Sequence, residues 1–143
     1  MLRKRESFSL TALLFIALSV IFLQAPGQSH GFGISIDVAP NTLNIQSQGQ
    51  VVTVHTNIAY SSVIGGSVTL NGLDIAWWKA DNQGNFVAKF LMSEVKALAD
   101  DELLEVPGEI ELALEGYTTG GDTFTGTQTI TVINVEPSGS GRK

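Results

Sequence analysis

The sequence predicts an all-β fold, an antiparallel β-sandwich of about seven or eight strands with one short connecting helix. Turn-forming residues recur roughly every ten positions between residues 34 and 135 and divide this region into short segments. Within most segments apolar and polar residues alternate, as they do in strands that bury one face. Only residues 93–104 show the wider apolar spacing of a helix.

Two segments carry the alternation most clearly. In residues 51–58 the even-numbered side chains share one face, and His55 lies on the other. In residues 105–117, Ile110 and Leu112 alternate with glutamates. We therefore expect the even-numbered side chains of both segments to form the core of the sandwich.

Turn residues predict how the strands connect. Asn71–Gly72 is typical of a tight hairpin turn. Residues 73–80 and 85–90 are expected to form two strands joined by a hairpin in which Gly84 permits the turn. Gly126, inside the last strand, predicts a bulge or a bend.

The predicted helix, residues 93–104, connects two strands. Ser93 is the expected N-cap, because a serine hydroxyl can accept a hydrogen bond from a free N–H of the first turn. Val95 and Leu98 are expected to face the core. One short helix of this kind does not change the all-β class.

Residues 1–31 are expected to be a signal peptide with its cleavage region. Basic residues 3–5 precede a mostly apolar run over residues 8–23, which is shorter than the roughly 20 residues that span a bilayer. Cleavage is expected at a small residue between Gly27 and Gly31, and an uncleaved anchor is the alternative. The protein is thus expected to be secreted or periplasmic, with residues 32–135 as the folded domain and residues 136–143 as a flexible tail.

Charge and cysteine content exclude several classes of function. Beyond residue 31 the chain has five Lys and Arg against 13 Asp and Glu, a net charge of −8. We therefore expect no nucleic-acid binding and no binding of the mature domain to anionic membranes. The chain has no cysteine, which excludes a disulfide framework, a thiol nucleophile and a thiolate metal site.

Two stretches carry a family resemblance. PNTLNIQSQGQVVTV (40–54) and GEIELALEGYTTGGDTFTGTQTITVI (108–133) together resemble small immunoglobulin-like modules of secreted bacterial proteins. The resemblance implies an immunoglobulin-like sandwich and a bacterial origin, but no activity, because the shared positions are turns and core residues. A partly closed β-barrel is the structural alternative.

No motif predicts catalysis, so we expect a non-enzymatic protein with no catalytic residue and no cofactor. His55 is the one histidine within the predicted strands, and no G-x-S-x-G motif is present. Glu109, Glu111 and Glu115 share one strand face at a spacing that an acid pair could use. Such a stripe on an open face is expected to be solvated instead, because it keeps the face soluble and discourages edge pairing.

Metal binding has little support in the sequence, and no metal site is predicted. One or two histidines without cysteine make zinc or copper a poor fit. Calcium is the open alternative, because carboxylates supply the oxygen ligands that it prefers. Asp81, Asp100 and Asp101 are the residues that such a site would use.

The two tryptophans are expected to face opposite sides of one strand. Trp77 shares its parity with Ile75, so it is predicted to be the core tryptophan. Trp78 is predicted to face outward, and with Tyr60 and Tyr117 it forms our set of candidate ligand-binding residues. An exposed Trp78 could stack on sugar, cover part of a protein partner, or pack beneath the helix.

These observations predict an exported binding or structural module that mediates protein–protein interaction at the cell envelope or outside the cell. Its partner is an unknown protein or a second copy of the chain. The alternative function is a carbohydrate-binding module that uses the exposed Trp78 as a stacking platform.

Overall fold

The computed structural model describes residues 31–103 and 105–136. Of the predicted signal peptide and cleavage region (1–31) the structure describes only Gly31, which is the first residue of a strand, and of the predicted tail (136–143) only Glu136; the remaining residues of both lie outside the described part. Within the described part of the chain, no helix has both the length and the apolar character needed to cross a bilayer.

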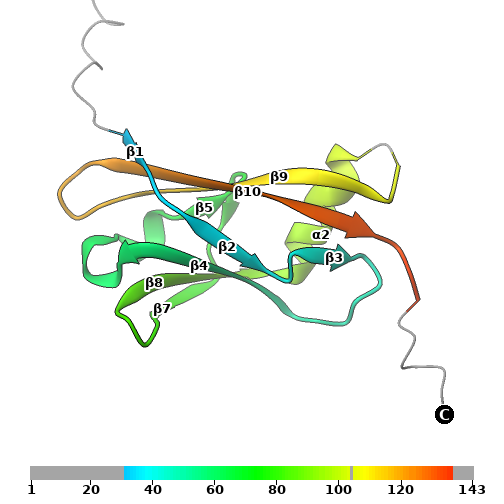
Figure 1. Cartoon of the computed structure of the whole chain (residues 1–143), viewed down its shortest axis with the longest axis horizontal. Helices are drawn as coiled ribbons and strands as arrows, with labels where there is room; N and C mark the ends of the chain where they lie inside the picture. Colours follow the sequence, from blue (N-terminus) through cyan, green and yellow to red (C-terminus); the bar gives the residue numbers. More distant parts are fainter. Residues whose placement is uncertain (1–30, 104, 137–143) are drawn as a thin grey trace, which may run out of the picture. The chain divides into compact units, whose positions relative to one another are not determined.

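Two β-sheets pack face to face and appear as two layers in Figure 1. The first, here the β9–β10 sheet, has the order β1-β10-β9-β5-β6, with β3 also paired to β10. Its strands are β1 (Gly31–Gly33), β3 (Thr42–Asn44), β5 (Thr69–Leu70), β6 (Leu73–Asp74), β9 (Gly108–Tyr117) and β10 (Thr123–Ile133). The second, here the β4–β8 sheet, has the order β2-β4-β8-β7. Its strands are β2 (Ile36–Ala39), β4 (Val51–Ala59), β7 (Trp77–Ala80) and β8 (Asn85–Leu91).

The core lies between the facing sides of the two sheets, as the alternation predicts. The largest fully buried side chains are Phe86, Phe90 and Phe124. The even-numbered residues expected in the core from segments 51–58 and 105–117 are buried: Val52, Val54, Thr56 and Ile58 on β4, and Ile110, Leu112 and Leu114 on β9. The prediction of a two-sheet, sandwich-like β fold with one helix is therefore confirmed, although the described residues form ten strands where seven or eight were expected.

The first segment of the described chain changes sheets twice. β1 and β3 pair in parallel with the two ends of β10, whereas β2, between them, pairs antiparallel with β4 in the other sheet. β2 is not paired with β10; instead, the Gln128 side chain of β10 accepts the Val38 N–H of β2 at 2.8 Å. Two parallel pairs thus interrupt a sheet that the sequence predicts to be antiparallel throughout.

Gly126 is explained by this exchange and not by a bulge. The pairing of β10 with β9 continues through Gly126 without a shift in register, so the predicted bulge is wrong. A Cβ atom at this position would lie 2.7 Å from Ile36 Cγ2 and 2.9 Å from the Ile34 carbonyl oxygen. The crossing segment therefore approaches β10 so closely that only glycine fits.

Residues 73–80 form two strands and not the single strand that the pattern predicts. β6 belongs to the β9–β10 sheet and β7 to the β4–β8 sheet, so Ile75 and Ala76 carry the chain from one sheet to the other. The preceding turn is as predicted, with positive φ at both Asn71 (48°) and Gly72 (87°). Because of this crossing, the alternation of side chains between the two faces does not continue from β6 into β7.

The single α-helix of the described residues is α2 (Met92–Glu102). It buries Met92, Val95 and Ala99, and half-buries Leu98. Ser93 lies inside the helix, so its predicted N-cap role is wrong; Leu91 occupies that position and makes no side-chain cap. The reason is that α2 begins directly where β8 ends, which leaves no loop residue free to cap it.

Three connections meet at one end of the two-sheet domain. The β4–β5 connection, residues 60–68, contains the 3₁₀ turns η2 (Tyr60–Ser62) and η3 (Gly65–Ser67). Its Tyr60 N–H donates to the Gly84 carbonyl in the β7–β8 turn at 2.8 Å. The Thr119 N–H in the β9–β10 turn donates to the Ser62 carbonyl at 3.0 Å.

Gly126→Ala should lower the free energy of unfolding by about 1–3 kcal/mol, because the added methyl group overpacks a filled position. Urea unfolding at neutral pH measures the change. Gly120→Ala is the matched control: its Cβ would meet only Thr118 Oγ1 at 3.8 Å, so a change within about 0.5 kcal/mol is expected. Equal losses in both variants would contradict the close approach.

Candidate functional site

Trp77 does not lie in the core, so that prediction is wrong. It pairs with Lys89, which pairs with Thr53, on the outer face of the β4–β8 sheet. Its side chain is 46% exposed. The parity expected along one strand does not hold because residues 75 and 76 cross between the sheets, so Trp77 is not on the same strand as Leu73.

Trp78 is exposed as predicted, but it leaves β7 on the core-facing side. It pairs with the buried Ala88, which pairs with the buried Val54. Because β7 is the last strand of its sheet, the indole is only partly covered and remains 39% exposed. A Cβ at Gly65 would lie 2.6 Å from Cδ2 of the indole, so Trp78 packs directly on this buried glycine.

The other two candidate residues lie near the same connection. Tyr60 is 39% exposed and stacks on Phe86, with ring centroids 6.2 Å apart and an interplanar angle of 27°. Tyr117, at the end of β9, is 52% exposed, and its carbonyl accepts the Ile64 N–H at 3.0 Å. Trp78, Tyr60 and Tyr117 thus all border residues 60–68, but only Tyr117 lines the hollow described below.

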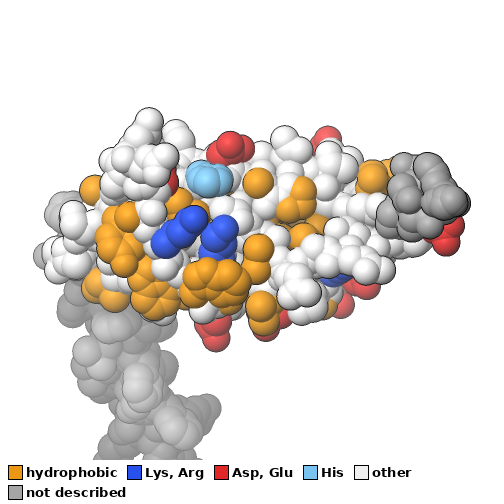
Figure 2. Space-filling view, turned by 90° about the horizontal axis from the view of Figure 1, so that it is seen from below, with side chains coloured by type: hydrophobic (Ala, Val, Ile, Leu, Met, Phe, Trp, Pro, Cys, Tyr) orange, Lys and Arg blue, Asp and Glu red, His pale blue; other side chains and the backbone are white. Residues whose placement is uncertain are grey.

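A basic and aromatic patch covers the outer face of β7 and β8. One row across the sheet holds Trp77, Lys89 and Thr53, with the Lys89 ammonium donating to Thr53 Oγ1 at 2.9 Å. The next row holds Lys79, the buried Val87, His55 and Asp37. Figure 2 shows basic side chains and a histidine close together among hydrophobic side chains on this face.

This patch is unusual in charge for the domain that carries it. Residues 31–136 contain three lysines and 13 Asp and Glu, a formal net charge of −10. Two of the three lysines, Lys79 and Lys89, lie in the patch, and the third, Lys96, donates to the Ser47 carbonyl. A recess of about 440 Å³ adjoins the patch between His55 and the β7–β8 turn. Sequence reasoning missed the patch because it assigned Trp77 to the core.

β7 is a free strand edge. Among the described residues no strand pairs with it on the side away from β8, and all four of its residues are exposed. The Asp81 N–H donates to the Asn85 carbonyl at 2.9 Å, which sets the alternation of the ladder. By that alternation the main-chain groups of Trp78 and Ala80 point away from β8, toward the open edge.

The β7–β8 hairpin is built as predicted, with Gly84 at φ 82°. Asp81 Oδ1 accepts the N–H groups of Gln83 (2.8 Å) and Asn85 (2.9 Å), and the Asp81 carbonyl accepts the Gly84 N–H. The hydrogen bond from Asn85 is the main reason that the pKa of the Asp81 carboxyl lies below its ordinary value of 3.8. Asp81 therefore orders the turn at the end of the free edge.

The carboxylates proposed for calcium do not come together. Asp81 lies in the β7–β8 turn, whereas Asp100 and Asp101 lie in the last turn of α2. Among the described residues no group of three or more His, Cys, Asp or Glu side chains is arranged to hold a metal ion. The structure thus offers no preformed arrangement of acids for the calcium alternative.

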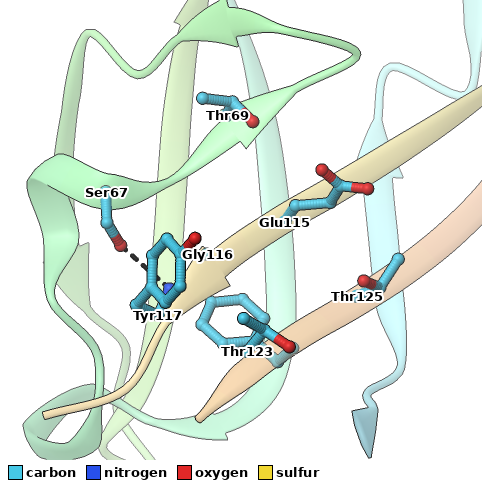
Figure 3. A pocket seen from close by; sticks show the side chains of 8 residues that line it. Ser67, Thr69, Glu115, Gly116, Tyr117, Thr123 and Thr125 are labelled. Atoms are coloured by element: carbon cyan, nitrogen blue, oxygen red, sulfur yellow. Dashed lines mark hydrogen bonds between the residues drawn. The ribbon is translucent and has the colours of Figure 1, made fainter. Parts of the chain in front are cut away.

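A hollow of about 390 Å³ lies on the β9–β10 sheet (Figure 3). Its lining residues come from η3, β5, β9 and β10; they are Ser67, Thr69, Glu115, Gly116, Tyr117, Thr123, Phe124 and Thr125. The hollow forms because β5 begins only at Thr69, so the end of β9 is paired with β10 on one side and has no β5 strand on the other. Instead, Ser67 Oγ accepts the Tyr117 N–H at 2.9 Å.

The glutamate stripe runs along the same face. Glu109, Glu111 and Glu115 are all exposed, as the solvated interpretation predicts. They pair with Thr131, Thr129 and Thr125 of β10. The outer face of this sheet is therefore acidic and rich in hydroxyl groups, in contrast to the basic patch on the other sheet.

Comparisons with known proteins assign no family to the chain. No protein-family model matches it, and neither a curated protein nor a solved structure does. The resemblance to immunoglobulin-like modules of secreted bacterial proteins therefore stays a prediction. Two surfaces are the candidates for a functional site: the β7 edge with its basic patch, and the hollow at Tyr117.

Gly65→Ala should push the Trp78 indole off the domain, because the new methyl group would occupy the space of the ring. In a Trp77→Phe background Trp78 is the sole tryptophan. We expect its fluorescence emission to shift to the red and acrylamide quenching to increase. Gly66→Ala is the control, since its Cβ would meet Trp78 Cη2 at an ordinary 4.0 Å. Unchanged spectra in Gly65→Ala would contradict the contact.

Asp81→Asn should destabilise the domain at neutral pH and progressively less in acid. A pKa lowered in the folded state stabilises above the unfolded value, near 3.8, and this contribution is lost as the pH falls through the folded pKa. Urea unfolding of both proteins between pH 7 and pH 2.5 measures the difference. Asp122→Asn is the control, because its carboxylate accepts no hydrogen bond from the described residues. A difference independent of pH would contradict the role of the carboxylate.

Proposed function

We propose that this protein is an exported, non-enzymatic, immunoglobulin-like module that binds a protein partner by accepting an extended segment along β7. The observation that carries the proposal is the free edge of β7, which exposes two indoles and a lysine in four residues. Export, to the periplasm or outside the cell, is proposed from the basic and apolar start of the chain.

The strand order supports the immunoglobulin-like part of the proposal. Immunoglobulin-like sandwiches have one sheet of order A-B-E-D and a second that contains G-F-C. Numbered in chain order, β2-β4-β8-β7 corresponds to A-B-E-D, and β10-β9-β5-β6 corresponds to G-F-C followed by one further strand. The N-terminal segment, which is shared between both sheets, supplies the first strand of each.

The β7 edge has the chemistry that strand addition uses. In this mode of recognition the main chain of the edge pairs with an extended peptide, and alternate side chains supply specificity. The outward main-chain groups of Trp78 and Ala80 offer the pairing, and Trp77 and Lys79, on the outer face of β7 itself, flank the outer side of an added strand. Tryptophan is also enriched among the residues that contribute most binding energy at interfaces.

Charge indicates what kind of segment would bind. Lys79 and Lys89 form a local basic site in a domain whose described residues carry −10. An extended segment with acidic and apolar residues would complement the two lysines and the indole of Trp77. A second copy is the less favoured occupant, because two strongly acidic domains repel each other.

Ala80→Pro should abolish binding at the β7 edge and leave the fold intact. Proline removes an N–H that points to solvent and clashes with an added strand, whereas the ladder to β8 keeps its hydrogen bonds. Peptides selected from a random display library on the wild-type protein should alternate apolar and acidic residues. Their affinity should fall at least about tenfold in Ala80→Pro and in Trp77→Ala.

Tyr117→Ala is the control for loss of an aromatic ring on the other sheet, and it should retain the selected peptides. Urea unfolding verifies that Ala80→Pro is folded. Peptides that bind Ala80→Pro as well as wild type, or the absence of any selected peptide, would refute strand addition. Concentration-dependent dimerisation that Ala80→Pro abolishes would instead identify a second copy as the occupant.

A further inference from the structure

We propose that the hollow at Tyr117 is a binding site for a neutral carbohydrate, a mono- or disaccharide unit that stacks on the Tyr117 ring. The site lies on the β9–β10 sheet and is independent of the partner-binding edge, which belongs to the other sheet. The site stands independently of the function proposed for β7.

The register places an aromatic ring within a field of hydroxyl groups. Tyr117 pairs with Thr123, and its neighbour two residues back, Glu115, pairs with Thr125 on one side and Thr69 on the other. Paired residues lie about 5 Å apart across the strands, and residues two apart on one strand about 7 Å. These spacings bring several polar side chains within the length of one or two sugar units. Figure 3 shows these side chains around the open space.

Two glycines keep the hydroxyl groups accessible. In β1, Gly31 pairs with Thr123 and Gly33 with Thr125, on the same outer face. A Cβ at Gly31 would lie 3.0 Å from Thr123 Oγ1 and would crowd it. Because neither glycine has a side chain, the platform stays open on the β1 side.

Tyr117 is held where a sugar can reach it. Its N–H donates to Ser67 Oγ at 2.9 Å and its carbonyl accepts the Ile64 N–H at 3.0 Å, so the backbone is fixed on both sides. The ring itself is 52% exposed, and the fully buried Phe124 contributes to the wall of the hollow. A rigid, exposed ring of this kind presents a flat apolar face at a low entropic cost.

The polar groups fit the hydroxyl pattern of a sugar. Each threonine or serine hydroxyl can both donate and accept, and an ionised carboxylate can accept two hydrogen bonds from adjacent hydroxyl groups. Thr123, Thr125 and Thr69 supply the first kind of group, and Glu115 supplies the second. The combination matches vicinal diols better than it matches a peptide, which needs main-chain partners in a row.

Charge restricts the ligand to neutral sugars. No lysine or arginine of the described residues lines the hollow, and Glu115 is within it. Asp74 continues the row of Thr69 and Glu115, and Glu111 lies further along the same strand face. A sulfated, phosphorylated or uronic sugar would meet these carboxylates without a compensating cation. The volume of about 390 Å³ is near the lower end of small-molecule sites, which suits one or two sugar units.

Trp78 is the weaker candidate for this role. Part of its ring rests on Gly65, and its partner across the ladder is the apolar Ala88. It therefore lacks the flanking hydroxyl and carboxylate groups that Tyr117 has. The carbohydrate site is therefore proposed at Tyr117 and not at Trp78.

The test is a screen in which the protein, purified in the form that the cell produces, is measured for binding to a set of oligosaccharides. The probes are neutral oligosaccharides of glucose, galactose, mannose and N-acetylglucosamine, with uronic-acid oligomers alongside. For the best neutral probe, calorimetry or ligand-observed NMR should show a loss of about tenfold or more in Tyr117→Ala. Tyr117→Phe, which keeps the ring, should bind within a few-fold of wild type, and Glu115→Gln should bind more weakly.

Glu109→Gln is the matched control for Glu115→Gln, because it makes the same change on the same strand face but outside the hollow. The proposal is overturned if no neutral probe binds, if uronic oligomers bind better, or if Trp78→Ala loses binding while Tyr117→Ala keeps it. Ala80→Pro should bind the sugar normally, so failure of the β7 proposal and failure of this one are distinguishable.

Discussion

The packing of two apolar sheet faces against each other is the interaction on which this structure depends. The chain has no cysteine, so no disulfide contributes to its stability, and apolar burial has to outweigh the entropy lost on folding. Phe86, Phe90 and Phe124 lie fully buried between the sheets. The closeness of this packing also explains the glycines at positions 65 and 126, where a side chain or a crossing segment occupies the space that a Cβ would need.

The two outer faces, which take no part in this packing, differ in chemistry. The β4–β8 sheet presents Lys79 and Lys89 beside Trp77, whereas the β9–β10 sheet presents glutamates paired with threonines. Because the core separates the faces, the two proposed sites do not overlap. A protein segment at the β7 edge and a sugar at Tyr117 could therefore be held by one small domain at the same time.

The connection between β4 and β5 relates these surfaces to each other. Its Gly65 supports the Trp78 indole, and its Ser67 holds the end of β9 where Tyr117 lies. This connection between the sheets thus positions one aromatic side chain on each of them, Trp78 on the β4–β8 sheet and Tyr117 on the β9–β10 sheet. A change in this connection is expected to affect both surfaces, whereas changes on β7 or β10 affect one.

Local pattern in the sequence determined the strands, most of the turns and the helix, because alternation, turn residues and helical spacing act over a few neighbouring positions. His55 and the glutamates of β9 were placed correctly for that reason. Tertiary structure alone decided which sheet each strand joins. The crossing at residues 75 and 76 reversed the expected faces of Trp77 and Trp78, and the late start of β5 opened the hollow at Tyr117. Both features arise from pairing between distant segments, and no local periodicity encodes such pairing.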